Sequence, residues 1–322
     1  MASSWKHRSI FIAVLGSRLM FSGASLASER AHIHISAGIS ANTLLYRYTI
    51  EKGFYHEEGL EVLAVQAGML PGIQGLVGGN FDASQILGQG AGAILRGLPL
   101  RIVMVFDTRP LNWLFARNVK TLQELKGKQI AVSSFGAALD QMTRELLAKS
   151  GIDPQRDVAL RAVEPTPSRL AALMAGAVDA AVLNQTDSLI AKKNGFHELV
   201  FYGDHLEFVT AGVVVAEKTL AQRPDFMRRF LRGTLKGFFW FKTNEKEAVS
   251  RMANAMKVTE SEATEAYKAA QRGMSADGTI PRALQEKTIA LQRKTLKVER
   301  EVAPEQVYDF TTLRAIHKEM GP

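Results

Sequence analysis

Short runs of Ser, Asn, Gln and Gly follow four apolar segments of the sequence, and they are the residues that could hold a small ligand. Hydroxyls, carboxamides and backbone amides bind polar or anionic groups, and each hydrogen bond to a charged group contributes about 1.5–3 kcal/mol. The alternative is that Ser and Asn before a helix serve as N-caps, each worth about 1 kcal/mol to the fold. The candidates are Gly38, Ser40, Asn42, Gln85, Gly88, Gln89, Ser133, Ser134, Gly136, Asn184, Gln185 and Thr186.

One of these runs also fits a dinucleotide-binding motif. Residues 88–93 read GQGAGA, which matches G-x-G-x-x-A, and Asp107 follows 19 residues after Gly88. Against this interpretation, a helix from Gln89 must end near Arg96 and the motif does not open the fold, as it does in nucleotide-binding sheets. We therefore expect no nucleotide cofactor.

Metal and nucleophile chemistry have little support in the sequence. His32 and His34 would share one face of a strand, but no third ligand accompanies them, so we expect surface or strand-edge histidines and no metal. The chain has no cysteine, which removes thiolate ligands, a Cys nucleophile, disulfides and a lipid-anchored Cys. No G-x-S-x-G sequence is present. We expect neither a catalytic residue nor a cofactor.

A similar sequence motif occurs twice, as LVGGNFDASQI and LMAGAVDAAVL, and it indicates the helices and strands that position the candidate ligand-binding residues. In each copy an apolar helix ends at a glycine, Gly79 or Gly176, because glycine accepts the left-handed conformation of a helix C-terminus. An aspartate, Asp82 or Asp179, then starts a strand by bonding nearby backbone amides. Each copy is thus one helix-to-strand connection.

The surroundings of the motif are also doubled, which predicts two α/β lobes with parallel-type sheets. Later segments predict a strand at 209–216 and helices at 224–256, 260–270 and 281–297, the last two covering the first lobe. Before the two copies we expect strands at 32–39, 60–65, 129–133 and 158–163, and helices at 43–52 and 137–150.

Two segments, 106–114 and 208–212, are expected to connect the lobes as hinges. They add Trp113 and Thr210 as ligand-binding candidates, since an indole ring stacks on planar ligands. Arg109 could pair with an anion, but we expect a solvated hinge cation. The predicted lobes comprise residues 28–108 with 212–322, and residues 109–211.

Residues 1–27 resemble a secretory signal peptide, with a basic start, an apolar run and a small-x-small ending at Ala27. Without Lys6, Arg8 and Arg18, 37 basic residues remain against 32 acidic ones, so the net charge falls from +8 to +5. The surplus is scattered over helical patterns, and we expect no nucleic-acid partner.

Six stretches, in this order, resemble the substrate-binding proteins of ABC importers for nitrate, sulfonates, taurine and thiamin-pyrimidine precursors. The resemblance spans nearly the whole chain after residue 27. It departs from the family where SSFG replaces a Lys-Gly-Ser opening and where LNQTD follows VDAAV. The stretches are GFYHEEGLEV, LVGGNFDASQI, LKGKQIAV, LLAKSGIDPQRDV, LAALMAGAVDAAVL and PDFMRRFLRGTLKG.

The resemblance implies a type II periplasmic-binding fold, in which the chain crosses twice between two lobes that close on a ligand. It implies a monomeric periplasmic receptor that delivers a small anionic or heteroaromatic molecule to an ABC permease. Its ligand-facing loops match the four candidate clusters. The alternative is an enzyme on the same scaffold, since relatives include enzymes of thiamin-pyrimidine and menaquinone synthesis; the cysteine-rich motif of the former is absent here.

Overall fold

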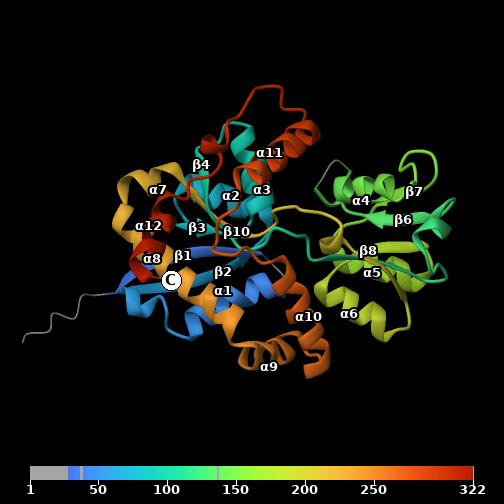
Figure 1. Ribbon diagram of the computed structural model, residues 1–322, viewed down its shortest axis with the longest axis horizontal. Helices are drawn as coiled ribbons and strands as arrows, with labels where there is room; N and C mark the ends of the chain where they lie inside the picture. The colour runs from blue at the N-terminus through green and yellow to red at the C-terminus, as the bar shows by residue number, and fades with distance from the viewer. Residues whose placement is uncertain (1–27, 37–38, 136–137, 322) are drawn as a thin grey trace, which may run out of the picture.

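The computed structural model describes residues 28–36, 39–135 and 138–321, and these form two five-stranded sheets that lie side by side (Figure 1). The predicted signal peptide lies outside the described residues. Among the residues that are described, no helix has the length and apolar character needed to cross a membrane.

The first sheet has the order β2-β1-β3-β10-β4. Strands β1, β2 and β3 are parallel, whereas β10 runs antiparallel to both β3 and β4, so the sheet is mixed rather than purely parallel. Its strands are β1 (Glu29–Ser36), β2 (Leu60–Ala67), β3 (Ala83–Ser84), β4 (Leu100–Val105) and β10 (Gly212–Ala216).

Helices cover both faces of the first sheet (Figure 1). Helix α8 packs with α1 and α9, whereas α2 and α3 pack together against β3, β10 and β4. Helix α7 lies beside α8 and β10. The helical region predicted at 224–256 is interrupted at Asn244, where α8 ends and α9 begins. The helices are α1 (Ala41–Glu51), α2 (Met69–Gly78), α3 (Leu87–Leu95), α7 (Glu217–Gln222), α8 (Pro224–Thr243) and α9 (Glu245–Met256).

The second sheet has the order β7-β6-β8-β5-β9 and is also mixed, because β5 runs antiparallel to β8 and β9. Its strands are β5 (Asn112–Ala116), β6 (Gln129–Val132), β7 (Ala159–Ala162), β8 (Ala180–Asn184) and β9 (His197–Phe201). Helix α4 (Ala138–Lys149) covers one face, and α5 (Thr166–Ala175) and α6 (Gln185–Lys193) cover the other (Figure 1). Short 3-10 turns lie at His56–Glu58, Leu122–Leu125, Tyr202–Asp204 and Pro304–Gln306.

The doubled motif builds the same connection in both sheets. Gly79 and Gly176 end α2 and α5 with φ of 78° and 72°. The sequence analysis expected the two aspartates to bond nearby backbone amides, and this was wrong. Each aspartate instead accepts a hydrogen bond from a neighbouring strand. Asp82 Oδ2 accepts from His32 N–H and Asp179 Oδ2 from Gln129 N–H, both at 2.8 Å and both across 50 residues.

The C-terminal helices pack mainly on the first sheet but also contact the second half of the molecule. They are α10 (Glu260–Gly273), α11 (Arg282–Leu296) and α12 (Thr311–Met320). Ala269 of α10 and Leu291 of α11 pack against the hydrophobic clusters of the second sheet. The prediction that this tail covers the first lobe therefore missed its contacts with the second sheet.

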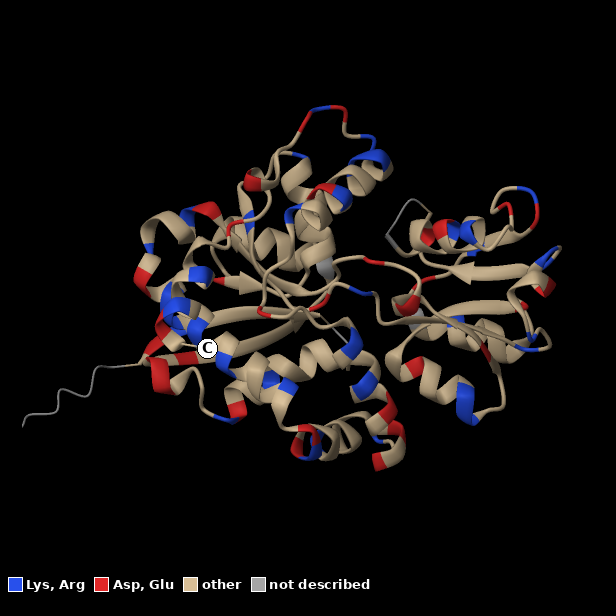
Figure 2. Cartoon of the chain, viewed as in Figure 1, with Lys and Arg blue, Asp and Glu red and all other residues tan. Residues whose placement is uncertain are grey.

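Basic residues on α8 are matched by acidic ones around them (Figure 2). Arg223 bonds Glu29 at 2.6 Å and also pairs with Asp82. Lys236 pairs with Glu57 at 2.7 Å and with Glu58 at 2.8 Å. These ion pairs tie α8 and its N-cap residue Arg223 to the start of the first sheet.

Candidate ligand-binding site

Four helices begin where a strand ends, on the sides of the two sheets that face each other (Figure 1). Helices α1 and α3 follow β1 and β3 of the first sheet, and α4 and α6 follow β6 and β8 of the second. Helix N-termini present unbonded backbone N–H groups and a partial positive charge, so they bind anionic groups. The candidate site is this region between the sheets. Gly38 and Gly136 lie outside the described residues.

Ser40 and Asn42 have structural roles at the start of α1. Ser40 is the N-cap, and its hydroxyl accepts from Thr43 N–H at 3.3 Å. Asn42 Nδ2 donates to Asp107 Oδ2 at 2.6 Å. Both residues are only partly buried, so these hydrogen bonds leave part of each residue exposed.

Asp107 joins that cluster to the segments that connect the sheets. Its Oδ1 accepts from Thr210 Oγ1 at 2.7 Å, Thr210 N–H at 3.1 Å and Ala211 N–H at 3.0 Å. Burial raises the pKa of Asp107, and these hydrogen bonds oppose that shift. Thr210 is thus a partner of a buried hinge carboxylate, a role that the sequence did not indicate.

The glycine-rich start of α3 is shaped by packing. A Cβ at Gly90 would lie 2.9 Å from Val214 Cγ2, which explains a glycine there without a nucleotide. Gln85 is buried and accepts from Ser36 N–H at 3.4 Å. The Gly88 carbonyl accepts from Gln292 of α11 at 3.4 Å, whereas Gln89 is exposed.

Ser133, at the end of β6, has a hydroxyl without a hydrogen-bond partner in the part of the chain that the structure describes. The residue is only 7% exposed, and a buried unsatisfied hydroxyl is costly. Its neighbour Ser134 is exposed and donates its N–H to Glu164 at 3.2 Å. The Ser133 hydroxyl is therefore not used by the protein's own hydrogen bonds among the described residues.

Residues at the start of α6 cross to the first sheet. Asn184 is the N-cap and accepts from Asp187 N–H at 2.8 Å. Gln185 Oε1 accepts from Ala41 N–H at 3.2 Å, and Thr186 Oγ1 donates to the Ile39 carbonyl at 2.8 Å. The start of α6 therefore contacts the start of α1 directly.

Trp113 and Arg109 lie near the segments that connect the sheets. Trp113 is 7% exposed and stacks on Phe201, with ring centroids 4.7 Å apart. Arg109 donates to the Gly203 carbonyl at 2.8 Å, so its guanidinium links two parts of the chain instead of facing solvent alone.

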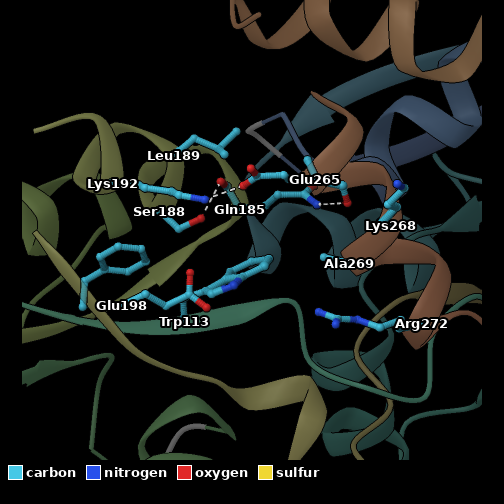
Figure 3. Close-up of a pocket in the computed structure, with 12 residues that line it drawn as sticks. Trp113, Gln185, Ser188, Leu189, Lys192, Glu198, Glu265, Lys268, Ala269 and Arg272 are labelled. Atoms are coloured by element: carbon cyan, nitrogen blue, oxygen red, sulfur yellow. Dashed lines mark hydrogen bonds and ion pairs between the residues drawn. The ribbon is translucent and has the colours of Figure 1, made fainter. Parts of the chain in front are cut away.

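A pocket of about 280 Å³ lies beside this region, between α6, β5 and α10 (Figure 3). Trp113 and Gln185 line it, together with residues that the sequence analysis did not single out. Those residues are Phe115, Ser188, Leu189, Lys192, Glu198, Glu265, Ala266, Lys268, Ala269 and Arg272. No motif could have identified them, because they become neighbours only when α10 packs against α6.

The two histidines do not form a metal site. His34 is fully buried in the middle of the sheet, not at a surface or strand edge, and its ring nitrogens lie 2.8 Å from Ser84 Oγ and 3.0 Å from the Ala67 carbonyl. His32 is exposed. Across residues 28–36, 39–135 and 138–321, no three His, Asp or Glu side chains are grouped to hold a metal ion.

Comparison with solved structures shows the fold. The putative periplasmic sulfonate-binding protein SsuA from Methylobacillus flagellatus is 18% identical, with a TM-score of 0.73 over 91% of this chain and 95% of that one. The periplasmic nitrate-binding protein NrtA from Synechocystis is 15% identical, with a TM-score of 0.68 over 90% and 89%. The desulfurization enzyme DSZB is 17% identical, with a TM-score of 0.66 over 91% and 100%.

A family model described as NMT1/THI5 like matches residues 41–248, well over half of the chain. No curated protein matches the sequence. The match includes the starts of α1, α3, α4 and α6 and both segments that connect the sheets. The chain therefore belongs to the NMT1/THI5-like family and has the two-sheet fold of periplasmic binding proteins.

Proposed function

We propose that this chain is the solute-binding protein of an ABC importer. The observation that carries the proposal is the meeting of α1 and α6, whose N-termini come from different sheets and are joined through Gln185 and Thr186. Facing helix N-termini on two halves that are linked by two short segments form a clamp for a small ligand. The proteins with this fold named above include binders of sulfonate and nitrate.

In this proposal the two lobes are residues 28–108 with 212–322, and residues 109–211. A ligand enters between them and is held by hydroxyls, carboxamides and backbone amides of the candidate residues. Closure is driven only by contacts that the closed state makes and the open state lacks. The closed, exported, monomeric protein then delivers its small anionic or heteroaromatic ligand to the permease.

The test is a thermal-shift screen of the protein recovered from the periplasm, against an alkanesulfonate, nitrate, a pyrimidine and an aromatic carboxylate. A ligand at about 100 times its Kd adds about 2.7 kcal/mol to the stability of the folded state, which is several degrees in Tm. Recovery of an uncleaved chain from the cytoplasm, with no compound raising Tm, contradicts the proposal.

A second candidate is an enzyme on the same scaffold, and the observation that favours it is the likeness to the desulfurization enzyme DSZB. Incubation of the protein with each compound of the same panel separates the two functions. A binding protein returns the compound unchanged by mass spectrometry, whereas an enzyme converts it.

A further inference from the structure

The pocket between α6 and α10 adjoins the strand ends that form the proposed cleft and extends away from them. Gln185 stands between them, since its Oε1 bonds Ala41 at the start of α1 while its Nε2 donates to the Ala266 carbonyl of α10 at 2.8 Å. Beyond Gln185 the pocket follows α6 as far as Lys192, about 10 Å further along the helix axis. It therefore starts at the N-terminal turn of α6 and continues along the flank of that helix (Figure 3).

The walls of the pocket come from both halves of the molecule. Trp113 and Glu198 belong to the second sheet, and Lys268 and Arg272 belong to α10. Ion pairs cross the rim, with Lys192 Nζ 2.5 Å from Glu265 and Arg272 4.0 Å from Asp204. The pocket thus exists only when the two halves are in this arrangement.

The size and floor of the pocket suit a small organic molecule. Its volume of about 280 Å³ equals that of roughly nine water molecules, at about 30 Å³ each in the liquid. Trp113, Phe115 and Leu189 supply an apolar surface on one side. A chain of a few carbon atoms fits this space.

Two solvent-exposed charges of opposite sign line the pocket, and neither has an ion-pair partner within 4.0 Å among the described residues. They are the carboxylate of Glu198 on β9 and the ammonium of Lys268 on α10. In Figure 3 the ring of Trp113 lies between Glu198 and the guanidinium of Arg272. Partial burial raises the pKa of Glu198, while the positive charges of Lys192 and Arg272 oppose that shift. A further cation beside the carboxylate would add to the stabilisation of its ionised form.

We propose that this pocket is a second ligand site, for a small zwitterion with an amine at one end and a carboxylate at the other. The amine lies beside Glu198 and against the Trp113 ring, which attracts cations. The carboxylate lies beside Lys268 and Arg272, one helical turn apart on α10. Because both halves supply the walls, a bound zwitterion favours the closed arrangement over the open one.

The test is calorimetric titration of the full chain with glycine, β-alanine and 4-aminobutyrate, which place the two charges at increasing separations. Matched controls are butyrate and butylamine, each with a single charge. We expect one of the zwitterions to bind and both single-charge compounds to bind about tenfold more weakly or not at all. The proposal is overturned if butyrate or butylamine binds as well, or if no zwitterion binds at up to about 10 mM.

Two variants test the two ends of the site. Glu198→Gln and Arg272→Gln should each weaken zwitterion binding about tenfold, while the cleft ligand found by the screen should bind as before. Glu301→Gln, at a residue whose side chain is 91% exposed and outside the pocket, is the matched control. Circular dichroism of each variant checks that it is folded. If both folded variants bind the zwitterion with unchanged affinity, the proposed site is wrong.

Discussion

The side chain of Gln185, on α6, accepts a hydrogen bond from the backbone N–H of Ala41, on α1, at 3.2 Å. Gln185 is 2% exposed, and its amide nitrogen bonds α10 as well. One carboxamide therefore connects three helices and both sheets. It also bonds an N-terminal amide of α1, a group of the kind that an anionic ligand would use.

We expect Gln185→Ala to lower the free energy of unfolding by about 1–3 kcal/mol, because the buried Ala41 N–H loses its side-chain acceptor and α10 loses its hydrogen bond to α6. The two halves should also separate more readily, so the radius of gyration in solution should increase. Urea denaturation and small-angle X-ray scattering measure the two effects. The control is Gln155→Ala, at an exposed residue. If Gln185→Ala leaves both the radius of gyration and the stability unchanged, the hydrogen bonds of Gln185 do not hold the two halves together.

Ser133→Ala should leave the empty protein as stable or make it more stable by about 1 kcal/mol, because it removes a buried hydroxyl without a partner. The same change should weaken binding of the ligand found in the thermal-shift screen. Ser150→Ala is the contrasting control, since that hydroxyl donates to the Leu146 carbonyl at 2.9 Å. If Ser133→Ala lowers the stability and leaves ligand binding intact, Ser133 stabilises the fold and does not bind the ligand.

The charges of Asp82 and Asp179 should contribute differently to the free energy of unfolding. Asp82 pairs with Arg223 and its side chain is 16% exposed, whereas Asp179 is 4.0 Å from Lys128 and 40% exposed. Asp82→Asn should therefore cost about 1.5–3 kcal/mol and Asp179→Asn at most about 1 kcal/mol. Urea denaturation of both variants measures the difference, and equal costs would show that the backbone hydrogen bond dominates.

Glu29 gives a prediction about pH. Burial alone would raise its pKa, but hydrogen bonds from Arg223 and Arg229 lower it. A carboxyl with a lowered folded-state pKa stabilises the protein above its unfolded-state pKa, and this contribution is lost as pH falls through the folded-state value. At pH 7 we therefore expect Glu29→Gln to cost about 0.5–1 kcal/mol, since the side chain is 38% exposed.

The cost of Glu29→Gln should fade as the pH falls below the ordinary pKa of a glutamate and through the lowered pKa of Glu29, because the wild-type carboxyl then becomes protonated. Denaturation at several pH values, with the exposed Glu299→Gln as control, measures this. A cost that persists at low pH would mean that the Glu29 ion pairs are not its origin.

Local patterns in the sequence predicted the connections that local chemistry determines. Gly79 and Gly176 were recognised because a left-handed helix end favours glycine, and both have positive φ. The partners of Asp82 and Asp179 were missed because they lie 50 residues away on another strand. Strand β5 was not predicted, because residues 106–114 were expected to form a hinge, and the antiparallel direction of β10 was missed because strand direction depends on where the chain returns.

The same limit applies to the candidate site. The sequence placed Ser40 and Asn184 correctly at helix starts, where both are N-caps. It gave no indication of Asp107 as the acceptor of Thr210, or of α10 as a wall of the pocket beside Gln185. Those contacts join segments that are more than 80 residues apart, and no periodicity or spacing encodes them.

The insertion of β10 between β3 and β4 has a consequence for biosynthesis. All five strands of the second sheet lie between Asn112 and Phe201, so that sheet is complete once Phe201 has left the ribosome. The first sheet has a gap in its interior until Ala216 emerges, although four of its strands are made earlier. The first sheet, whose strands are synthesised first, can therefore assemble completely only after the second sheet.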